Sequence, residues 1–402
     1  MFKKLKQVFR EDSPYRLFLL TLLITGVGYG IYKGILDNYM AEVVHIEKMD
    51  RGVVEFFREI PGLLLIFITA ALYTLSAERI YKIGAVIMLG GMVMISAVPA
   101  TKALVTMAIC LYSLGEHIQL GMKNTLSLEY AKAGQGGKAL GHQNAMSNIG
   151  TVAGYGIVIA AFSLFSTEKP FRLFFSVGAV LIGIAMLLSF RIPGKSRQTG
   201  QKRFYFRKKF TKYYMLEVFY GARKQVFFTF GPYLLILHYG ADAPVISLLF
   251  AISAVAAYFL APLVGNIIDK VGYKAVMISD TLILVIVCFF YGFADHLFPT
   301  SVAFIVCCVN YVLDSVISLA SMASNVYVQD ISDSAEETRA TISTGISVNH
   351  LITILIALFG GWIWEALGPE ALFILSAVLG LCNSAYAATI KTGAQLRAAG
   401  KM

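Results

Sequence analysis

Ionisable side chains lie inside several of the long apolar runs of this chain. The set comprises Lys33, Asp37, Glu116, His117, Arg223, Lys224 and Asp314. A charged side chain in the middle of a hydrocarbon layer costs roughly 2.5–3.5 kcal/mol on insertion scales, so each of these positions suggests a function. Arginine and lysine bind carboxylates and phosphates, whereas a buried carboxyl or a histidine can carry a proton near neutral pH. The residue types therefore predict recognition of a polar solute together with proton transfer.

Helical spacing places these residues on polar stripes. Lys33 and Asp37 are four residues apart and share a helix face with Gly26 and Gly30. The other stripes are Tyr112, Glu116, Gln119 and Lys123; Glu217, Tyr220 and Lys224; Asn310, Asp314, Ser318, Ser321 and Asn325; and Ser343, Ser347 and His350. Such stripes are expected to face protein or water and not lipid.

Two alternatives to solute recognition stay open for these residues. Ion pairs such as Lys33 with Asp37, or Glu116 with Lys123, could simply hold helices together. A structural ion pair is also the expectation for the shallow group Glu55, Arg58 and Glu59, just before Pro61 and Gly62. His117 and His350 could instead ligate a transition metal, with Glu116, Asp314 and Asn349 as further candidates, although no Cys-x-x-Cys or His-rich segment accompanies them.

The composition indicates that these helices cross a membrane. Of the 402 residues 57% are hydrophobic and 14% are charged, where a soluble domain carries about 25% charged residues. Apolar runs of about 20 residues are long enough to cross about 30 Å of hydrocarbon. The first run, Leu17 to Ile35, is expected to be an uncleaved span and not a signal peptide.

The apolar runs predict an all-α membrane protein with twelve transmembrane helices. We expect them near residues 16–40, 51–76, 83–99, 102–123, 139–165, 170–190, 213–238, 243–264, 273–293, 299–323, 340–364 and 370–390. The polar, basic segment 191–212 separates two groups of six. This gives an N-terminal six-helix bundle over 1–190, a basic cytoplasmic linker over 191–212, and a C-terminal six-helix bundle over 213–402.

The basic residues are distributed unevenly over the connections between these spans. The net charge is +10, and most of the lysines and arginines fall on the N-terminus, the linker and every second loop. Cytoplasmic loops carry such an excess, so both termini and the linker are expected in the cytoplasm, with the protein in the cytoplasmic membrane. The excess charge thus orients the chain, and no nucleic acid is expected as a partner.

The two halves of the chain repeat each other. A shift of 201 residues lays Asn124 on Asn325 and Asn148 on Asn349, and a shift of 191 lays Lys82 on Tyr273. Several such matches in the same order indicate duplication. Because each half holds an even number of spans, the repeats are expected to be parallel.

One loop carries a resemblance to a known family. The segment Gly265-x-x-x-Asp269-Lys270-x-Gly272-Tyr273-Lys274 resembles the cytoplasmic loop motif of the major facilitator superfamily, from which only Tyr273 departs. The matching loop of the first half is degenerate, with Thr74, Glu78 and Tyr81 at motif positions. The resemblance implies two pseudo-symmetric six-helix bundles around a central cavity. It also implies a cytoplasmic gate, for which the candidates are Glu78, Arg79, Gly265, Asp269, Lys270 and Gly272.

In that family spans one, four, seven and ten line the cavity, and all four carry charge here. The resemblance therefore implies substrate-binding residues Lys33, Asp37, Tyr220, Arg223, Lys224, Asn325, Asn349 and His350, and proton-coupling residues Glu116, His117 and Asp314. The predicted function is secondary active transport of a small polar solute, anionic or zwitterionic, by alternating access, coupled to protons or another ion. No cofactor, no bound structural metal and no enzymatic activity are expected, and the protein is expected to be a monomer surrounded by lipid.

Three alternatives remain at this stage. Aromatic residues such as Phe227, Phe228 and Tyr233 leave open an exporter of amphipathic drugs or lipids. The two histidines leave open a divalent transition-metal transporter, and a receptor that kept the fold without transport is the third alternative. A nucleotide-driven pump is disfavoured because the chain has no Gly-x-x-x-x-Gly-Lys-Ser/Thr motif.

Overall fold

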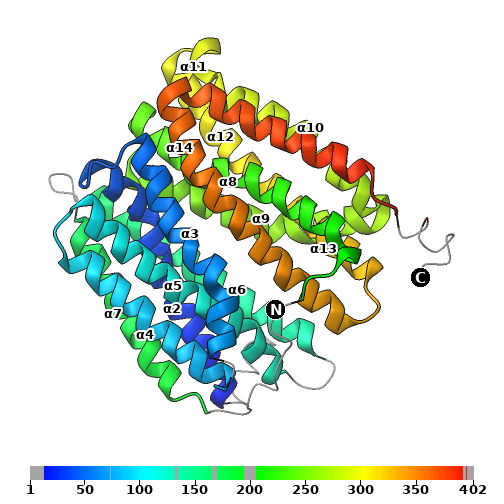
Figure 1. Cartoon of the computed structure of the whole chain (residues 1–402). Helices are drawn as coiled ribbons and strands as arrows, with labels where there is room; N and C mark the ends of the chain where they lie inside the picture. The colour runs from blue at the N-terminus through cyan, green and yellow to red at the C-terminus, as the bar shows by residue number, and fades with distance from the viewer. Residues whose placement is uncertain are drawn as a thin grey trace. The chain divides into compact units, whose positions relative to one another are not determined.

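The computed structural model describes residues 13–72, 74–131, 135–164, 170–193 and 205–392, together with Gln395. Residues 1–12 lie outside the described ranges, and so do residues 194–204, which form half of the predicted linker. Within these ranges the chain is helical and has no strand. The helices are α2 (Ser13–Glu42), α3 (Lys48–Ala71), α4 (Ala77–Ala97), α5 (Lys102–Glu129), α6 (Gly136–Leu164), α7 (Phe171–Phe190), η1 (Lys208–Phe210), α8 (Thr211–Tyr239), α9 (Ala243–Val271), α10 (Tyr273–Gly292), α11 (Ala294–Leu297), α12 (Thr300–Ile317), η2 (Ser318–Ser321), α13 (Met322–Ile331) and α14 (Ala335–Ala388) (Figure 1).

Nine helices of the described chain are long and apolar enough to cross a membrane. The segment from α12 to α13 counts as one of them, and α14 counts once although its backbone changes direction. Gly368 has φ of 89° and is followed by Pro369, so α14 consists of two helices that meet at this kink. Neither α3 nor α8 is among the nine.

The described chain divides into two compact units. Unit 1 comprises 1–45, 60–203 and 242–251, and unit 2 comprises 46–59, 204–241 and 252–402. Two helices are therefore shared: α3 belongs to unit 2 up to Glu59, and α9 belongs to unit 1 up to Ala251. In α3 the change comes immediately before Pro61, which cannot donate a backbone hydrogen bond within the helix.

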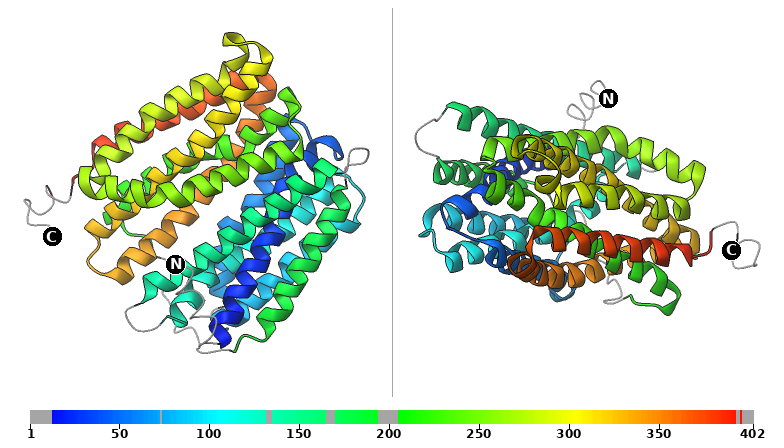
Figure 2. Two further views of the ribbon diagram at one scale, coloured as in Figure 1. Left: turned by 180° about the vertical axis from the view of Figure 1, so that it is seen from behind. Right: turned by 90° about the horizontal axis from the view of Figure 1, so that it is seen from above.

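Unit 1 is packed through small residues that let helices approach closely. α2 packs against both α6 and α7, and α4 packs against α5 (Figures 1 and 2). A Cβ placed on Gly30 would lie 2.2 Å from the backbone oxygen of Thr151, and one on Gly154 would lie 2.4 Å from that of Val27. Gly26 and Gly150 make a second reciprocal contact of the same kind. Close contacts between small residues are a general means of packing helices in lipid, where the hydrophobic effect gives no drive.

Unit 2 has an aromatic core between α8, α10 and α14. The rings of Phe227, Tyr291 and Phe373 all lie within contact distance of one another, with centroid separations of 4.6–5.2 Å. All three side chains are fully buried. Aromatic residues on α8 are thus core residues of unit 2, which weakens their use as an indication of an amphipathic substrate.

The described end of the linker is docked on the start of α14. Tyr205 donates a hydrogen bond to Glu337 at 2.6 Å, and Arg207 and Lys209 lie 3.3 and 3.4 Å from the same carboxylate. Burial, together with this carboxylate, raises the pKa of Tyr205 to about 12, so its hydroxyl stays protonated and continues to donate. Ser334 caps α14 by accepting from the backbone N–H of Glu337.

One lysine in each unit binds a helix end in the same way. Lys82, at the start of α4, donates to the carbonyl of Ile192 at 2.9 Å, and Lys274, at the start of α10, donates to that of Ile390 at 3.0 Å. Cations favour the carbonyl ends of helices. The structural counterpart of Lys82 is therefore Lys274, one residue beyond the Tyr273 that the shift of 191 lays on it.

Candidate functional site

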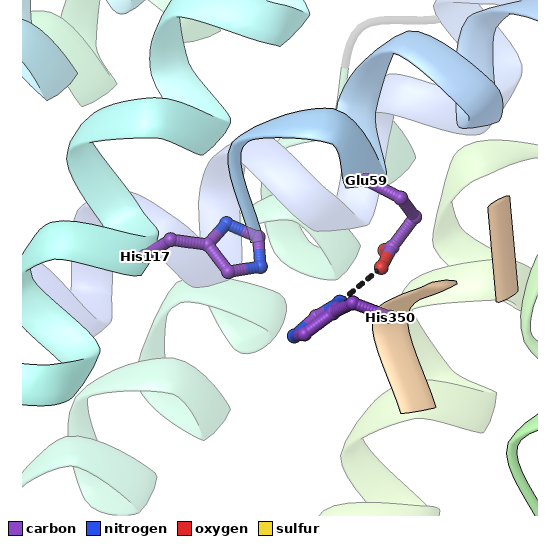
Figure 3. A group of neighbouring side chains, drawn as sticks. All are labelled: Glu59, His117 and His350. Carbon is purple, nitrogen blue, oxygen red and sulfur yellow. Dashed lines mark hydrogen bonds and ion pairs between the residues drawn. The ribbon is translucent and has the colours of Figure 1, made fainter. Parts of the chain in front are cut away.

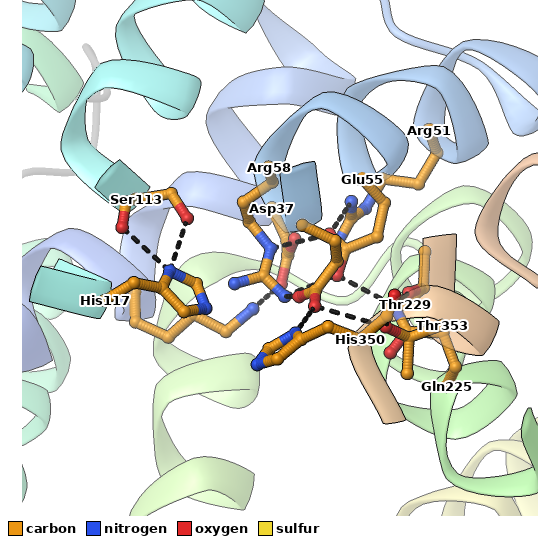
Figure 4. Close-up of polar contacts among 12 residues, drawn as sticks. Asp37, Arg51, Glu55, Arg58, Ser113, His117, Gln225, Thr229, His350 and Thr353 are labelled. Atoms are coloured by element: carbon orange, nitrogen blue, oxygen red, sulfur yellow. Dashed lines mark hydrogen bonds and ion pairs between the residues drawn. The ribbon is translucent and has the colours of Figure 1, made fainter. Parts of the chain in front are cut away.

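The N-terminal half of α3 carries a buried charge network inside unit 2. Glu55 is completely buried and accepts hydrogen bonds from Arg51 at 2.8 Å and from Arg58 at 2.6 and 2.9 Å (Figure 4). On α8, Gln225 donates to the same carboxylate at 3.0 Å and to Thr229 at 2.8 Å. A buried carboxylate needs partners of this kind, because the loss of water would otherwise be costly.

The network continues to α14 through the next glutamate. Glu59 binds Arg58. Its Oε2 lies 2.7 Å from His350 Nδ1 (Figure 3) and 3.3 Å from the hydroxyl of Thr353. Because a carboxylate can only accept, Nδ1 of His350 carries the proton of this bond. The predicted substrate residue His350 is therefore bound to the shallow acidic group that the sequence suggested as a structural pair.

Close backbone packing accompanies the charges. A Cβ on Gly52 would lie 2.4 Å from the carbonyl of Ala357 and 3.2 Å from Gly361 Cα. Arg51 lies over the ring of Tyr233 at 5.4 Å and Arg58 over that of Phe228 at 5.0 Å. Charges, rings and glycines together attach residues 48–59 of α3 to α8 and α14.

A second buried charge cluster lies deeper in unit 2. Arg223 on α8 forms an ion pair with Asp280 on α10, and its backbone carbonyl accepts from Ser376 of α14 at 3.1 Å. Its Nη1 has no hydrogen-bond partner among the described residues. Asp314 on α12 is buried, the cations that act on it are Arg223 and Lys224, and no described residue forms a hydrogen bond with its carboxyl group. Predicted residues Arg223 and Asp314 are thus brought together, although the sequence had given them separate roles.

The other predicted substrate residues of unit 2 lie on α8, α13 and α14 and are less buried than Arg223. Lys224 is exposed and lies 6.0 Å from the ring of Tyr220, whose hydroxyl donates to the carbonyl of Ser318 at 2.9 Å. Asn349 donates to the backbone carbonyl and the carboxylate of Glu217 at 3.3 and 3.4 Å. Asn325 is exposed. Of this group, only Lys224 presents a charge to its surroundings.

Unit 1 has its own charged residues. Lys33 pairs with Asp37 at 3.0 Å and lies 5.1 Å from the ring of Phe250. His117 is buried, and its Nδ1 lies 2.8 Å from the carbonyl of Ser113 in the preceding turn. Glu116 is partly buried, and its charge acts on Lys123. The expected pairing of Lys33 with Asp37 is present.

The predicted gate residues lie at the start of α4, near the end of α9 and in the turn after α9. Gly272 has φ of 93°, which favours glycine, and it makes the turn between α9 and α10. Gly265 lies inside α9, and no described atom comes within 4 Å of a Cβ placed there. Asp269 and Lys270 are exposed and have no ion-pair partner among the described residues.

The matching loop of unit 1 differs in its acidic residue. Glu78 is buried and accepts a hydrogen bond from Ser76, while Arg79 is exposed. Glu78 lies in the first turn of α4, where a negative charge interacts favourably with the helix dipole. A latch formed by Glu78, Arg79, Asp269 and Lys270 stays a prediction.

The charged residues Arg51 and Asp280 and the amide Gln225 belong to these clusters but were not among the sequence candidates. Asp280 is a lone acid in an apolar run, and that feature alone could have identified it, but only the spans implied by the resemblance were considered. Arg51 and Gln225 carried no comparable signal, because an arginine near a helix start and a single glutamine are common. Their roles depend on contacts between distant segments.

Comparison with known proteins places the second half of the chain beside a known family. A model of the Major Facilitator Superfamily matches residues 214–394. The matched segment contains the loop motif from Gly265 to Lys274 that carried the resemblance in the sequence. No curated protein matches the chain in sequence.

Several solved transporters share the fold of this chain. The nucleoside transporter NupG is 17% identical, with a TM-score of 0.74 and coverage of 94% of this chain and 100% of that one. A D-xylose–proton symporter is 15% identical, with a TM-score of 0.72 and coverage of 93% and 96%. A bacterial homologue of the iron transporter ferroportin is 12% identical, with a TM-score of 0.72 and coverage of 94% and 99%. At these identities the likeness concerns the fold, and the solutes differ among the three.

Proposed function

We propose that this protein is a proton-coupled secondary transporter of a small anionic or zwitterionic solute, acting by alternating access in the cytoplasmic membrane. The observation that supports this best is the Arg223–Asp280 pair with the carboxyl of Asp314 beside it. A carboxyl group that is buried near a cation, and that no other described residue binds, is suited to take up and release a proton.

Charge balance explains how the proton would matter. When Asp314 is protonated, the guanidinium of Arg223 balances the carboxylate of Asp280. When Asp314 is ionised, two buried carboxylates compete for that guanidinium, whose Nη1 has no described hydrogen-bond partner. Each protonation state thus favours a different set of contacts on α8, α10 and α12, and such a two-state element can couple a proton to a conformational change.

The topology of the proposed transporter follows the sequence prediction. We take α3, α8 and both arms of α14 as spans, which gives twelve in two pseudo-symmetric six-helix bundles. Both termini are placed in the cytoplasm by the distribution of basic residues. The predicted substrate residues stay Lys33, Asp37, Tyr220, Arg223, Lys224, Asn325, Asn349 and His350, with Lys224 as the exposed cation.

The role of Asp314 can be tested by comparing uptake with and without a pH gradient. A thermal-shift screen of organic acids, amino acids, nucleosides and sugars would first supply a radiolabelled solute. In proteoliposomes, we expect Asp314→Asn to bind this solute but to take it up equally with and without the gradient. The amide cannot carry a proton, yet it keeps the shape of the carboxyl group.

A further variant and a control sharpen this test. Glu116→Gln removes a carboxyl group in unit 1, which is the other predicted proton carrier, and Glu365→Gln removes an exposed one. Only Glu365→Gln should leave the response to the gradient as in the native protein. If both Asp314→Asn and Glu116→Gln keep the full response, protons are not carried by these groups.

A transition-metal substrate keeps one supporting observation within unit 2. His350 and Glu59 lie 2.7 Å apart on α14 and α3, and imidazole and carboxylate are both ligands of divalent transition metals. Titration with Co²⁺ would show a new visible absorption band, abolished by His350→Ala and kept by Asp314→Asn. Absence of the band removes this candidate.

A further inference from the structure

Unit 2 contains a cavity that lies apart from the cluster of Arg223, Asp280 and Asp314. Its volume is about 400 Å³, within the range of small-molecule sites. It is lined by Lys48 of α3, by Leu234, Leu237, His238 and Tyr239 at the end of α8, by Tyr291, Gly292, Ala294, Asp295 and His296, and by Trp364, Pro369 and Glu370 of α14. Arg223, Asp280 and Asp314 are not among the lining residues, so this is a separate site.

Two charged groups in the lining are already engaged. Asp295 pairs with His238 and accepts a hydrogen bond from the hydroxyl of Tyr239 at 2.9 Å. These contacts join α11 to the end of α8. They leave the Asp295 carboxylate with little capacity for a ligand.

Two other charged groups are not engaged in this way. The basic group nearest to Glu370 is the His296 ring, whose Nδ1 lies 3.8 Å from Oε1, which is too far for a hydrogen bond. The Glu370 side chain is only 29% exposed, and no described residue forms a hydrogen bond with it. Lys48 is exposed and forms no ion pair within the described ranges. One carboxylate and one ammonium therefore line the same cavity without strong partners.

Apolar and aromatic groups make up much of the rest of the lining. Trp364, Tyr291 and Leu234 are all buried, with exposed fractions of 3%, 1% and 4%. Trp364 is held by an edge-to-face contact with Phe230 at 5.8 Å. A rigid aromatic wall of this kind suits the hydrocarbon part of a small ligand.

We propose that this cavity is a second binding site for a small zwitterion that combines an ammonium, a carboxylate and a compact apolar side chain. Glu370 binds the ammonium, Lys48 binds the carboxylate, and Trp364 contacts the apolar part. A neutral α-amino acid has this chemistry. The site does not depend on the proposed proton coupling, because binding here requires no transport.

The composition of the chain offers a direct optical test. The chain has two tryptophans, Trp362 and Trp364, so Trp362→Phe leaves Trp364 as the single fluorescent reporter in the cavity. Purified full-length protein in detergent is titrated with L-leucine and L-phenylalanine. We expect a saturable change in Trp364 emission with at least one of them.

The chemistry of recognition is then tested on both partners. Glu370→Gln is expected to weaken binding about tenfold or more, since it removes a charge-assisted hydrogen bond, and Lys48→Met should also weaken it. Capping the amino group with acetyl should act like Glu370→Gln, and the methyl ester should act like Lys48→Met. The matched controls Glu365→Gln and Lys208→Met replace exposed residues outside the lining and should bind as the parent does.

The outcomes separate clearly. No saturable response to either amino acid, or equal affinity in Glu370→Gln and Glu365→Gln, overturns the second site. Saturable binding that requires Glu370 and a free amino group supports it. Because emission is measured without a pH gradient, neither result depends on the test of Asp314.

Discussion

Replacing Glu55 with glutamine is expected to be among the most destabilising single changes in the chain, at about 3–5 kcal/mol. The carboxylate is completely buried and balances Arg51 and Arg58. An amide removes the negative charge that both guanidinium groups bind, where little water can reach them, and Glu59 then remains as the carboxylate bound to Arg58. The apparent unfolding temperature in detergent, followed by size-exclusion chromatography after heating, measures the effect.

The control for Glu55 lies in the same segment. Glu47 is an exposed glutamate at the start of α3, and Glu47→Gln should change stability by no more than about 0.5 kcal/mol. Equal unfolding temperatures for the two variants would show that the network is not balanced by Glu55. The difference in unfolding temperature between the two variants also indicates how much the contacts of the N-terminal half of α3 with α8 and α14 contribute to stability.

Replacing Gly30 with alanine is the second change expected to have a large effect. A Cβ at this position would lie 2.2 Å from the backbone oxygen of Thr151, so α2 and α6 would have to move apart. Overpacking of this kind costs typically about 1–3 kcal/mol and more where backbone is involved. Because alanine favours a helix over glycine by about 1 kcal/mol, any loss must come from the helix contact.

Gly156→Ala in α6 is the matched control for this substitution. No described atom lies within 4 Å of a Cβ placed on Gly156, so the variant should be as stable as the parent or slightly more so. Yield and monodispersity after heating should fall for Gly30→Ala alone. A loss of stability as large in Gly156→Ala would mean that glycine is needed for a reason other than the α2–α6 contact.

Much of the helical architecture could be predicted from the sequence, because a span needs a long apolar run whatever its neighbours are. The fifth predicted span, 139–165, corresponds to α6 at Gly136–Leu164, and the predicted break between the last two spans falls at the Gly368 kink. The division of α3 between the two units was not predictable. Hydropathy does not show which unit the polar N-terminal half of a helix packs against.

The site was predicted less completely than the fold. Spacing along one helix indicated Lys33 with Asp37, since both lie on the same face. Arg223 with Asp280, and Glu55 with Gln225, join residues from different helices, and a single sequence carries no signal for such pairs. The resemblance directed attention to four helices, and Asp280 lies on another.

Proton-coupled transport is tested most directly by uptake into proteoliposomes with an imposed pH gradient, using purified protein and the solute found in the screen. We expect a carboxylate-bearing or zwitterionic solute to accumulate above its external concentration, and this accumulation to collapse when a protonophore removes the gradient. Asp314→Asn should show no accumulation at all. A solute that binds with high affinity but is never moved, with or without the gradient, would contradict transport and identify the chain as a receptor.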